Sequence, residues 1–303
     1  MKSFVKNTVN LILLPILILR KFYFWNKTNK SILPGRKFAE YGSKIGRNLL
    51  FKRKLSIKLL LNPVSIVRYF EFDYAQKYLE INEQDKILDI SSPYLFGFYQ
   101  SSKFVIPYYY INPDRVDLTN VISLSRKLKF KGNYSPQEID ALNIPYEDSF
   151  FSKVISISVI EHIKDDGDTL ALKEMWRVLK PNGILILTFP VKKEYNIEYK
   201  ENDEYNLNVG HASGGYFFQR IYNEQKIKER LLSSIDNFKI TSKEIFGTAT
   251  KDFFNEYKKR WIKYSYWETV KDPFYVTKYF TYFSDVNDLK DIGVMGLTIK
   301  KLK

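Results

Sequence analysis

Only two histidines occur in this chain of 303 residues, and imidazole is the side chain best suited to carry protons near neutral pH. His162 directly follows Glu161 after an apolar stretch, and His211 lies in a polar, glycine-bearing stretch, 206–215. A base beside a reacting hydroxyl takes its proton in the transition state, so all three are candidate catalytic groups. Each also has a structural alternative: packing within a loop for His162, an exposed loop position for His211, and helix capping for Glu161.

The segment 153–190 must position the first two of these side chains. Residues 153–158 are apolar and β-branched on both faces, which is typical of a buried parallel strand. A helix is predicted next, because large apolar residues recur at i, i+3, i+4 and i+7: Leu172, Met175, Trp176 and Leu179. The Pro-Asn-Gly sequence that follows is expected to end this helix before an apolar strand at 184–189.

Three aspartates precede this helix: Asp165, Asp166 and Asp168. Clustered carboxylates can indicate calcium, but the other ligands of a calcium loop are absent from the sequence. Capping of the helix by Asp166 or Asp168, together with solvation, explains these residues better. No metal site is predicted.

A second strand-and-loop unit lies upstream. Residues 65–81 carry apolar side chains at helical spacing, and 86–90 form an apolar strand that contains Asp89. The loop SSPYLFG follows. A strand, a tight loop of small residues and a helix form the ligand-binding edge of a doubly wound sheet. The next strand is expected at 108–111, because Pro107 cannot donate to a ladder.

The composition restricts the partners. A formal net charge of +14 favours an anionic partner, which leaves nucleic acid, a phospholipid surface or a phosphorylated small substrate. The lysines are spread over the whole chain without an arginine-rich or zinc-type signature, which favours a solvated basic surface over a nucleic-acid patch. The absence of cysteine excludes disulfides, thiol catalysis and Cys-based zinc sites.

Residues 1–62 are predicted to form an apolar and basic extension. The run 9–19 is strongly apolar, is interrupted by Pro15 and is followed by cations and aromatic residues. It is too short to span a bilayer, which takes about 20 apolar residues. Residues 1–25 are expected to contact a membrane surface or to form an arm on the domain or on a second subunit of a homo-oligomer, with a signal anchor as the third alternative. The expected location is cytoplasmic, with peripheral membrane contact under the first interpretation.

Three segments carry a family resemblance: KILDISSP at 86–93, ALNIPYEDSFFSKVISISVIEHI at 141–163 and RVLKPNGILILTFP at 177–190. In order and spacing they resemble a class I S-adenosylmethionine-dependent methyltransferase of the type 11 kind. The resemblance implies a Rossmann-like domain and S-adenosyl-L-methionine as the cofactor. RYFEFDYA, ISSP, SVIEHIKDDGD and FFQRIYNEQ resemble a subgroup associated with surface-glycan synthesis.

The resemblance assigns the methionine half of the cofactor to the first loop. Asp89 corresponds to the acid at the end of the first strand, and Ser91, Ser92 and Pro93 correspond to the glycine-rich turn. Serines thus replace glycines that let a backbone approach its ligand closely. Their hydroxyls are expected to bond the cofactor carboxylate or to replace a water. Gly97 is the remaining glycine of this loop.

The nucleoside half is assigned to two further loops. The usual ribose acid is absent after the second strand, so Asn112 or Asp114 is expected to serve in its place. Asp140 and Ala141 stand where the family faces the adenine.

The acceptor is expected beyond the fourth strand. Ser158 opens the loop where cofactor and acceptor meet, with Glu161 and His162 beside the sulfonium, and His211 falls where an acceptor loop would lie. Residues 191–222 are predicted to form an acceptor-side lid, whose aromatic and polar side chains suit a sugar. A lid with its own small core is the alternative.

The predicted fold class is α/β: a Rossmann-like seven-stranded sheet with helices on both faces, an N-terminal extension and a helical insertion near the C-terminus. The methyltransferase domain is expected at 63–303, with its last strands at 239–246 and 293–300. The insertion, at about 250–285, is expected to shield the acceptor, contact a membrane or form a dimer face.

The predicted function is O-methylation of a sugar hydroxyl in surface-glycan or polysaccharide biosynthesis. The glycan acceptor is expected to be nucleotide-linked, lipid-linked or growing, with its phosphates facing the basic surface. One alternative is a non-catalytic, membrane-associated scaffold that keeps the fold. The other is a methyltransferase for a lipid or small metabolite.

Overall fold

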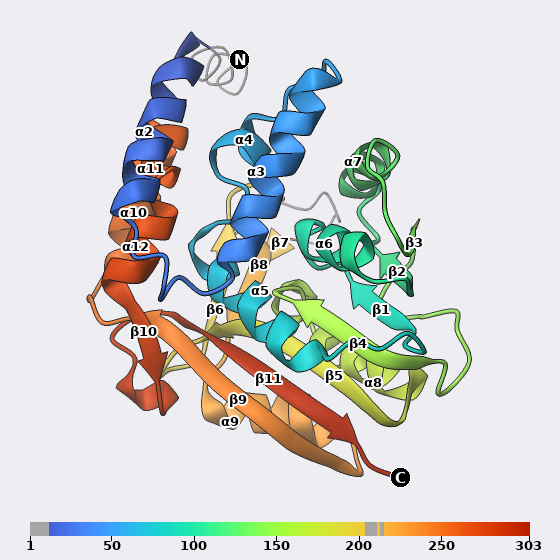
Figure 1. Ribbon diagram of the computed structural model, residues 1–303. Coiled ribbons are helices and arrows are strands. Elements are labelled where there is room, and N and C mark those ends of the chain that lie inside the picture. The colour runs from blue at the N-terminus through green and yellow to red at the C-terminus, as the bar shows by residue number, and fades with distance from the viewer. Residues whose placement is uncertain (1–11, 204–210, 213–214) are drawn as a thin grey trace.

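The computed structural model describes residues 12–203, 211–212 and 215–303, and its centre is an eight-stranded sheet in the order β10-β9-β11-β5-β4-β1-β2-β3 (Figure 1). Five strands run parallel: β1 (Ile87–Ile90), β2 (Pro107–Ile111), β3 (Asn133–Gln137), β4 (Phe151–Ile157) and β5 (Leu179–Val191). Three further strands at one end of the sheet pair antiparallel with their neighbours: β9 (Phe238–Thr248), β10 (Phe280–Phe283) and β11 (Gly293–Lys301). The Rossmann-like α/β prediction is confirmed, with one strand more than expected, because β10 pairs with the outer edge of β9.

Helices cover both faces of this sheet. α8 (Gly167–Val178) and the helical segment that begins with α9 (Glu224–Lys226) pack on one face, and α3 (Arg36–Phe51), α5 (Ile66–Leu79) and α6 (Leu95–Lys103) pack on the other. The strands alternate accordingly. In β4, Val154 belongs to the first apolar cluster and Ile155 to the second, so the strand is buried on both sides.

The predicted strand, helix and strand between 153 and 190 are confirmed as β4, α8 and β5. The helix ends at Val178, however, three residues before the Pro-Asn-Gly sequence. That sequence lies at the start of β5, where the register against β4 shifts and Asn182 takes a φ of 63°.

The amino-terminal residues form α2 (Leu14–Lys27), α3 and α4 (Ile57–Leu61). α3 has 16 residues and lies within the predicted extension. Its residues Phe38, Ile45 and Leu49 are buried in the same apolar cluster as α5. α2 runs beside the helices of the predicted insertion, α10 (Phe253–Tyr264), α11 (Tyr266–Thr269) and α12 (Asp272–Tyr279) (Figure 1). Within the described ranges, no helix combines the length and apolar character needed to cross a membrane.

A second, three-stranded sheet occupies the predicted lid segment. Its order is β6 (Asn196–Lys200), β8 (Gly215–Ile221) and β7 (His211–Ala212), all antiparallel. Tyr222 follows β8 and is fully buried against the main sheet, which fixes the small sheet at the edge of the loop after β4.

Candidate functional site

A cavity of about 1370 Å³ lies beyond the carboxyl ends of β1, β2 and β4. The loops after these strands form one wall, and residues of α4, α5, α10 and α11 form the other. Ligands bind at this edge in doubly wound folds. Nine of the predicted site residues line the cavity: Ser91, Ser92, Pro93, Asn112, Asp114, Asp140, Ala141, Ser158 and His162.

The turn after β1 keeps a glycine-like backbone although it has no glycine. Ser91 adopts a φ of 49°, in the left-handed region, at a cost of about 1 kcal/mol for a residue with a Cβ. Its N–H and its hydroxyl both donate to the carbonyl oxygen of Ile111 at 2.8 Å. The Ser92 hydroxyl accepts from the N–H of Ile157 at 3.0 Å. The two hydroxyls therefore join β1 to both neighbouring strands.

Gly97 has a different role from the turn. It lies within α6, and a Cβ there would come within 2.8 Å of the Tyr108 ring. This glycine therefore permits close packing of α6 on β2, and the turn depends on Ser91.

Asp89 supports this turn from behind and does not line the cavity. It is fully buried, and its carboxylate accepts from the Ser92 N–H at 3.0 Å and from the Tyr108 hydroxyl at 2.5 Å. Burial raises the pKa of Asp89 to about 6, although these hydrogen bonds favour the carboxylate.

Acidic and amide side chains face the cavity after β2. Asp114 caps α7 (Arg115–Ser125) by accepting from the N–H groups of Val116 and Asp117. The Asn112 amide donates to the Asp117 carboxylate at 2.9 Å. Asp117 also lines the cavity, and burial raises its pKa. These oxygens suit the hydroxyls of a ribose, and Asp117 adds an acid that the sequence interpretation missed.

A third loop completes this side of the cavity. Asp140 accepts from the Leu142 N–H at 2.9 Å, and Ala141 is buried beside it. Acceptor groups for hydroxyls and amines thus occur on two loops next to the serine turn that lines the same cavity, so the residues present fit a nucleoside-bearing cofactor.

The loop after β4 is held by a buried carboxylate from α5. Ser158 adopts a φ of 48°, and its hydroxyl donates to Glu71, which is fully buried. Thr188, near the end of β5, donates to the same carboxylate oxygen at 2.9 Å, and Arg68 pairs with the other oxygen. Glu71 therefore fixes the ends of β4 and β5 together.

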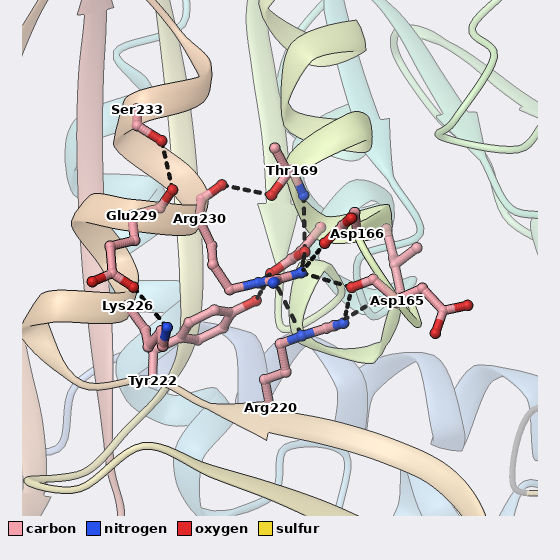
Figure 2. A network of polar contacts seen from close by, with 11 residues as sticks. Asp165, Asp166, Thr169, Arg220, Tyr222, Lys226, Glu229, Arg230 and Ser233 are labelled. Carbon is pink, nitrogen blue, oxygen red and sulfur yellow. Dashed lines mark hydrogen bonds and ion pairs between the residues drawn. The ribbon is translucent and has the colours of Figure 1, made fainter. Parts of the chain in front are cut away.

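The far end of this loop is held by two arginines (Figure 2). Arg230 lies 2.7 Å from the buried carboxylate of Asp168, and the Nε of Arg220 lies 3.6 Å from it. Both guanidinium groups also donate to the carbonyl oxygen of Asp165. Tyr222 donates to Asp168 at 2.9 Å. The three aspartates were expected to cap the helix or to be solvated. Asp166 is the N-cap residue of α8 but makes no side-chain cap hydrogen bond, and Asp168 is buried with two charged partners.

His162 and Glu161 lie in the loop between Ser158, which is bonded to Glu71, and Asp168, which is bonded to the two arginines. Nδ1 of His162 lies 2.7 Å from the carbonyl oxygen of Phe218 in β8. Nε2 lies 3.7 Å from Oε1 of Glu161. Glu161 is buried behind the cavity lining, and burial raises its pKa to about 8. The backbone of His211 lies in β7 opposite Tyr216, and its side chain lies outside the described part of the chain.

The opposite wall is aromatic and comes mainly from the insertion. Tyr257, Trp261 and Tyr266 line the cavity, and Tyr94 faces it from the turn after β1. Asp272 is buried in this wall, where it accepts from the Tyr257 hydroxyl at 2.7 Å and from the Asn62 amide at 2.8 Å. Burial raises the pKa of Asp272 to about 8.

Two cations complete the lining on this side, Lys58 of α4 and Arg68 of α5. Since Arg68 also pairs with Glu71, one side chain connects the cavity with the anchor of the loop after β4.

Part of the chain is similar in sequence to known proteins. Residues 108–187 match a family described as a methyltransferase domain. The matched segment runs from β2 to β5 and includes the whole loop after β4. A probable tRNA methyltransferase 9B from Mus musculus is 37% identical over 65 residues, which cover 21% of this chain and 14% of that protein. This chain thus matches only a small part of that relative's length.

The chain is similar to two solved structures, and the first supports the fold. The MccD protein has a TM-score of 0.51 and 15% identity, over 78% of this chain and 99% of its own. An S-adenosylmethionine-dependent methyltransferase from Methanosarcina mazei gives 0.48 and 14%, over 75% and 97%. The family match supports the predicted class I methyltransferase domain and S-adenosylmethionine as its cofactor.

Proposed function

We propose that this protein transfers a methyl group from S-adenosylmethionine to a hydroxyl of a sugar, in a nucleotide-linked, lipid-linked or growing surface glycan. One observation carries the proposal: the strand-end loops assigned to the cofactor and the aromatic wall of the insertion line the same cavity. Cofactor and acceptor can therefore meet in one cavity.

The chemistry of the aromatic wall supports a sugar acceptor. Sugar rings present apolar C–H faces that pack on aromatic rings, and Tyr257, Trp261 and Tyr266 supply such rings. The hydroxyls of a sugar need polar partners at the same time, and Asp272 and Asn62 lie beside the rings. Lys58 and Arg68 add positive charge for a phosphate on the acceptor.

The protein must orient the acceptor hydroxyl and remove its proton. S-adenosylmethionine, when bound, supplies an electrophilic methyl group on sulfur. A carbonyl oxygen only accepts hydrogen bonds, so the contact with Phe218 places a proton on Nδ1 of His162 and directs proton uptake to Nε2. Glu161 lies beside Nε2, and its carboxylate form stabilises the imidazolium of His162. His162 is accordingly the proposed base.

The first test is calorimetric titration with S-adenosylmethionine and S-adenosylhomocysteine. Saturable binding of both is expected, and no binding at millimolar concentration would contradict the proposal and favour a non-catalytic scaffold. An acceptor panel of sugar nucleotides, lipid-linked sugars, lipids and small metabolites then separates the acceptor classes by methyl transfer.

A matched pair of variants tests the aromatic wall. Trp261 and Tyr264 lie on the same helix with exposed fractions of 48% and 46%, but only Trp261 lines the cavity. We expect Trp261→Ala to raise the acceptor KM about tenfold and Tyr264→Ala to leave it unchanged, as loss of one stacking contact costs about 1 kcal/mol or more. Equal effects of the two variants would count against a sugar on this wall.

A further inference from the structure

α2 is apolar on two opposite sides. One side packs through Leu17 on Leu61 and Val270. On the other, Ile16, Leu19 and Tyr23 recur at i, i+3 and i+7, and Phe22 lies beside them, all exposed. Leu19 is 71% and Phe22 65% exposed. Apolar sides of a helix are normally buried, and within the part of the chain that the structure describes this exposed stripe is left uncovered.

The insertion extends this stripe. Ile262 of α10 and Trp267 of α11 are exposed on helices that run beside α2 (Figure 1). Arg20 of α2 joins the two parts: its Nε donates to the carbonyl oxygen of Trp267 at 3.0 Å, and its guanidinium lies 4.2 Å from the centre of that ring. We call these six exposed residues the apolar face: Ile16, Leu19, Phe22, Tyr23, Ile262 and Trp267.

The apolar face is surrounded by positive charge. Lys27, Lys258 and Lys263 are exposed on the same helices. The acids nearby already have cationic partners, since Glu256 pairs with Lys259 and the buried Glu268 pairs with Arg260 and Lys271. An isologous contact between two copies would bring these cations together, so charge complementarity favours an anionic partner over a second copy.

We propose that the apolar face binds the surface of a bilayer that contains anionic lipids. Exposed leucine, isoleucine and aromatic side chains enter the boundary between headgroups and acyl chains, and the surrounding lysines pair with anionic headgroups. The helices concerned lie along the membrane plane in this arrangement.

This surface also explains how a lipid-linked acceptor reaches the cavity, a step that rests on the proposed function. Trp261 and Tyr266 line the cavity, and their chain neighbours Ile262 and Trp267 belong to the apolar face. The same helices therefore contact the membrane on one side and the acceptor on the other. A lipid-linked acceptor can therefore place its sugar in the cavity while its lipid stays in the bilayer.

Sedimentation of the full chain with vesicles tests the proposal. We expect binding to phosphatidylcholine vesicles that contain phosphatidylglycerol, with weak binding to pure phosphatidylcholine and a decrease at high salt. Phe22→Glu should lower the partition coefficient about tenfold, because the bilayer no longer buries an aromatic side chain at this position. Val105→Glu is the matched control: Val105 is 68% exposed on another part of the surface and its variant should bind like the wild type. Thermal unfolding checks that both variants fold.

Three results would overturn the proposal. These are no binding of the wild type to the anionic vesicles, equal losses in Phe22→Glu and Val105→Glu, or a dimer that Phe22→Glu converts to a monomer without changing vesicle binding. The last would assign the apolar face to a second copy. Cofactor titration on the same samples keeps the two proposals apart, because a protein that binds S-adenosylmethionine but no vesicle contradicts only the membrane surface.

Discussion

Nδ1 of His162 lies 2.7 Å from the carbonyl oxygen of Phe218, so a strand of the small sheet fixes the orientation of a side chain in the cavity. This carbonyl oxygen, which can only accept, therefore sets which nitrogen of the imidazole carries the proton.

The first prediction concerns this base. His162→Gln should lower kcat by about 10²- to 10⁴-fold, the usual contribution of a general base, while the affinity for S-adenosylmethionine changes little. Formation of S-adenosylhomocysteine measures kcat, and calorimetry measures affinity. His211→Ala should be assayed alongside, since a loss of kcat confined to that variant would transfer the role to His211.

The second prediction concerns the turn after β1. Ser91→Gly relieves the left-handed strain but loses one hydrogen bond to Ile111, so the unfolding free energy should change by less than about 1 kcal/mol and cofactor binding should persist. Ser91→Val should destabilise the protein by about 2 kcal/mol, because a β-branched residue resists positive φ. Urea unfolding measures both, and a loss of cofactor binding in Ser91→Gly would show that the hydroxyl itself holds the ligand.

The third prediction concerns pH. The pKa of Glu161 is about 8 in the folded protein, against about 4.3 in an unfolded chain, so between these values only the folded state holds the proton. The stability contribution of the protonated acid is complete below pH 4 and is lost as the pH rises through 8, with a slope of at most about 1.4 kcal/mol per pH unit. Glu161→Gln should reduce this decline in urea unfolding between pH 5 and 8. Glu40→Gln, an exposed control, should follow the wild type.

The fourth prediction concerns the arginine pair. The Arg220 side chain is 4% exposed and pairs with the fully buried Asp168, so Arg220→Met should lower the unfolding free energy by about 3 kcal/mol. Arg36→Met removes an exposed pair with Glu40 and should cost about 0.5 kcal/mol. Similar costs for the two variants would show that the buried pair contributes little.

The unit of β4, α8 and β5 and the ligand-binding edge could be predicted because they follow from local sequence patterns. The loops after β1, β2 and β4 bring Ser91, Asn112 and Ser158 to one cavity. α3 was less apparent because two positions on its buried side are glycines. A Cβ at Gly42 would lie 2.4 Å from Pro63, and one at Gly46 would lie 2.8 Å from Leu59. At these two positions the helix packs through its backbone, so the sequence lacks the large apolar residues that would mark a buried side.

Partners distant in sequence could not be predicted by the same means. Glu71 has the pattern of a surface acid on an amphipathic helix, and only the tertiary structure places it against Ser158 and Thr188. Arg220 belongs to the segment whose polar side chains were expected to suit a sugar, and it is buried beside Asp168. The segments RYFEFDYA, ISSP, SVIEHIKDDGD and FFQRIYNEQ do meet at the loop after β4, through contacts of Glu71, Ser92 and Arg220.

The bridge from Glu71 to Thr188 joins residues 117 positions apart. Closing so long a loop costs conformational entropy before any contact repays it, which makes such contacts late events in folding. During synthesis, α5 leaves the ribosome well before β5, and its carboxylate stays hydrated until that strand arrives. The loop that carries His162 therefore acquires its shape only after the chain has been made through Arg230, and a shorter nascent chain has the first strands of the sheet but no working cavity.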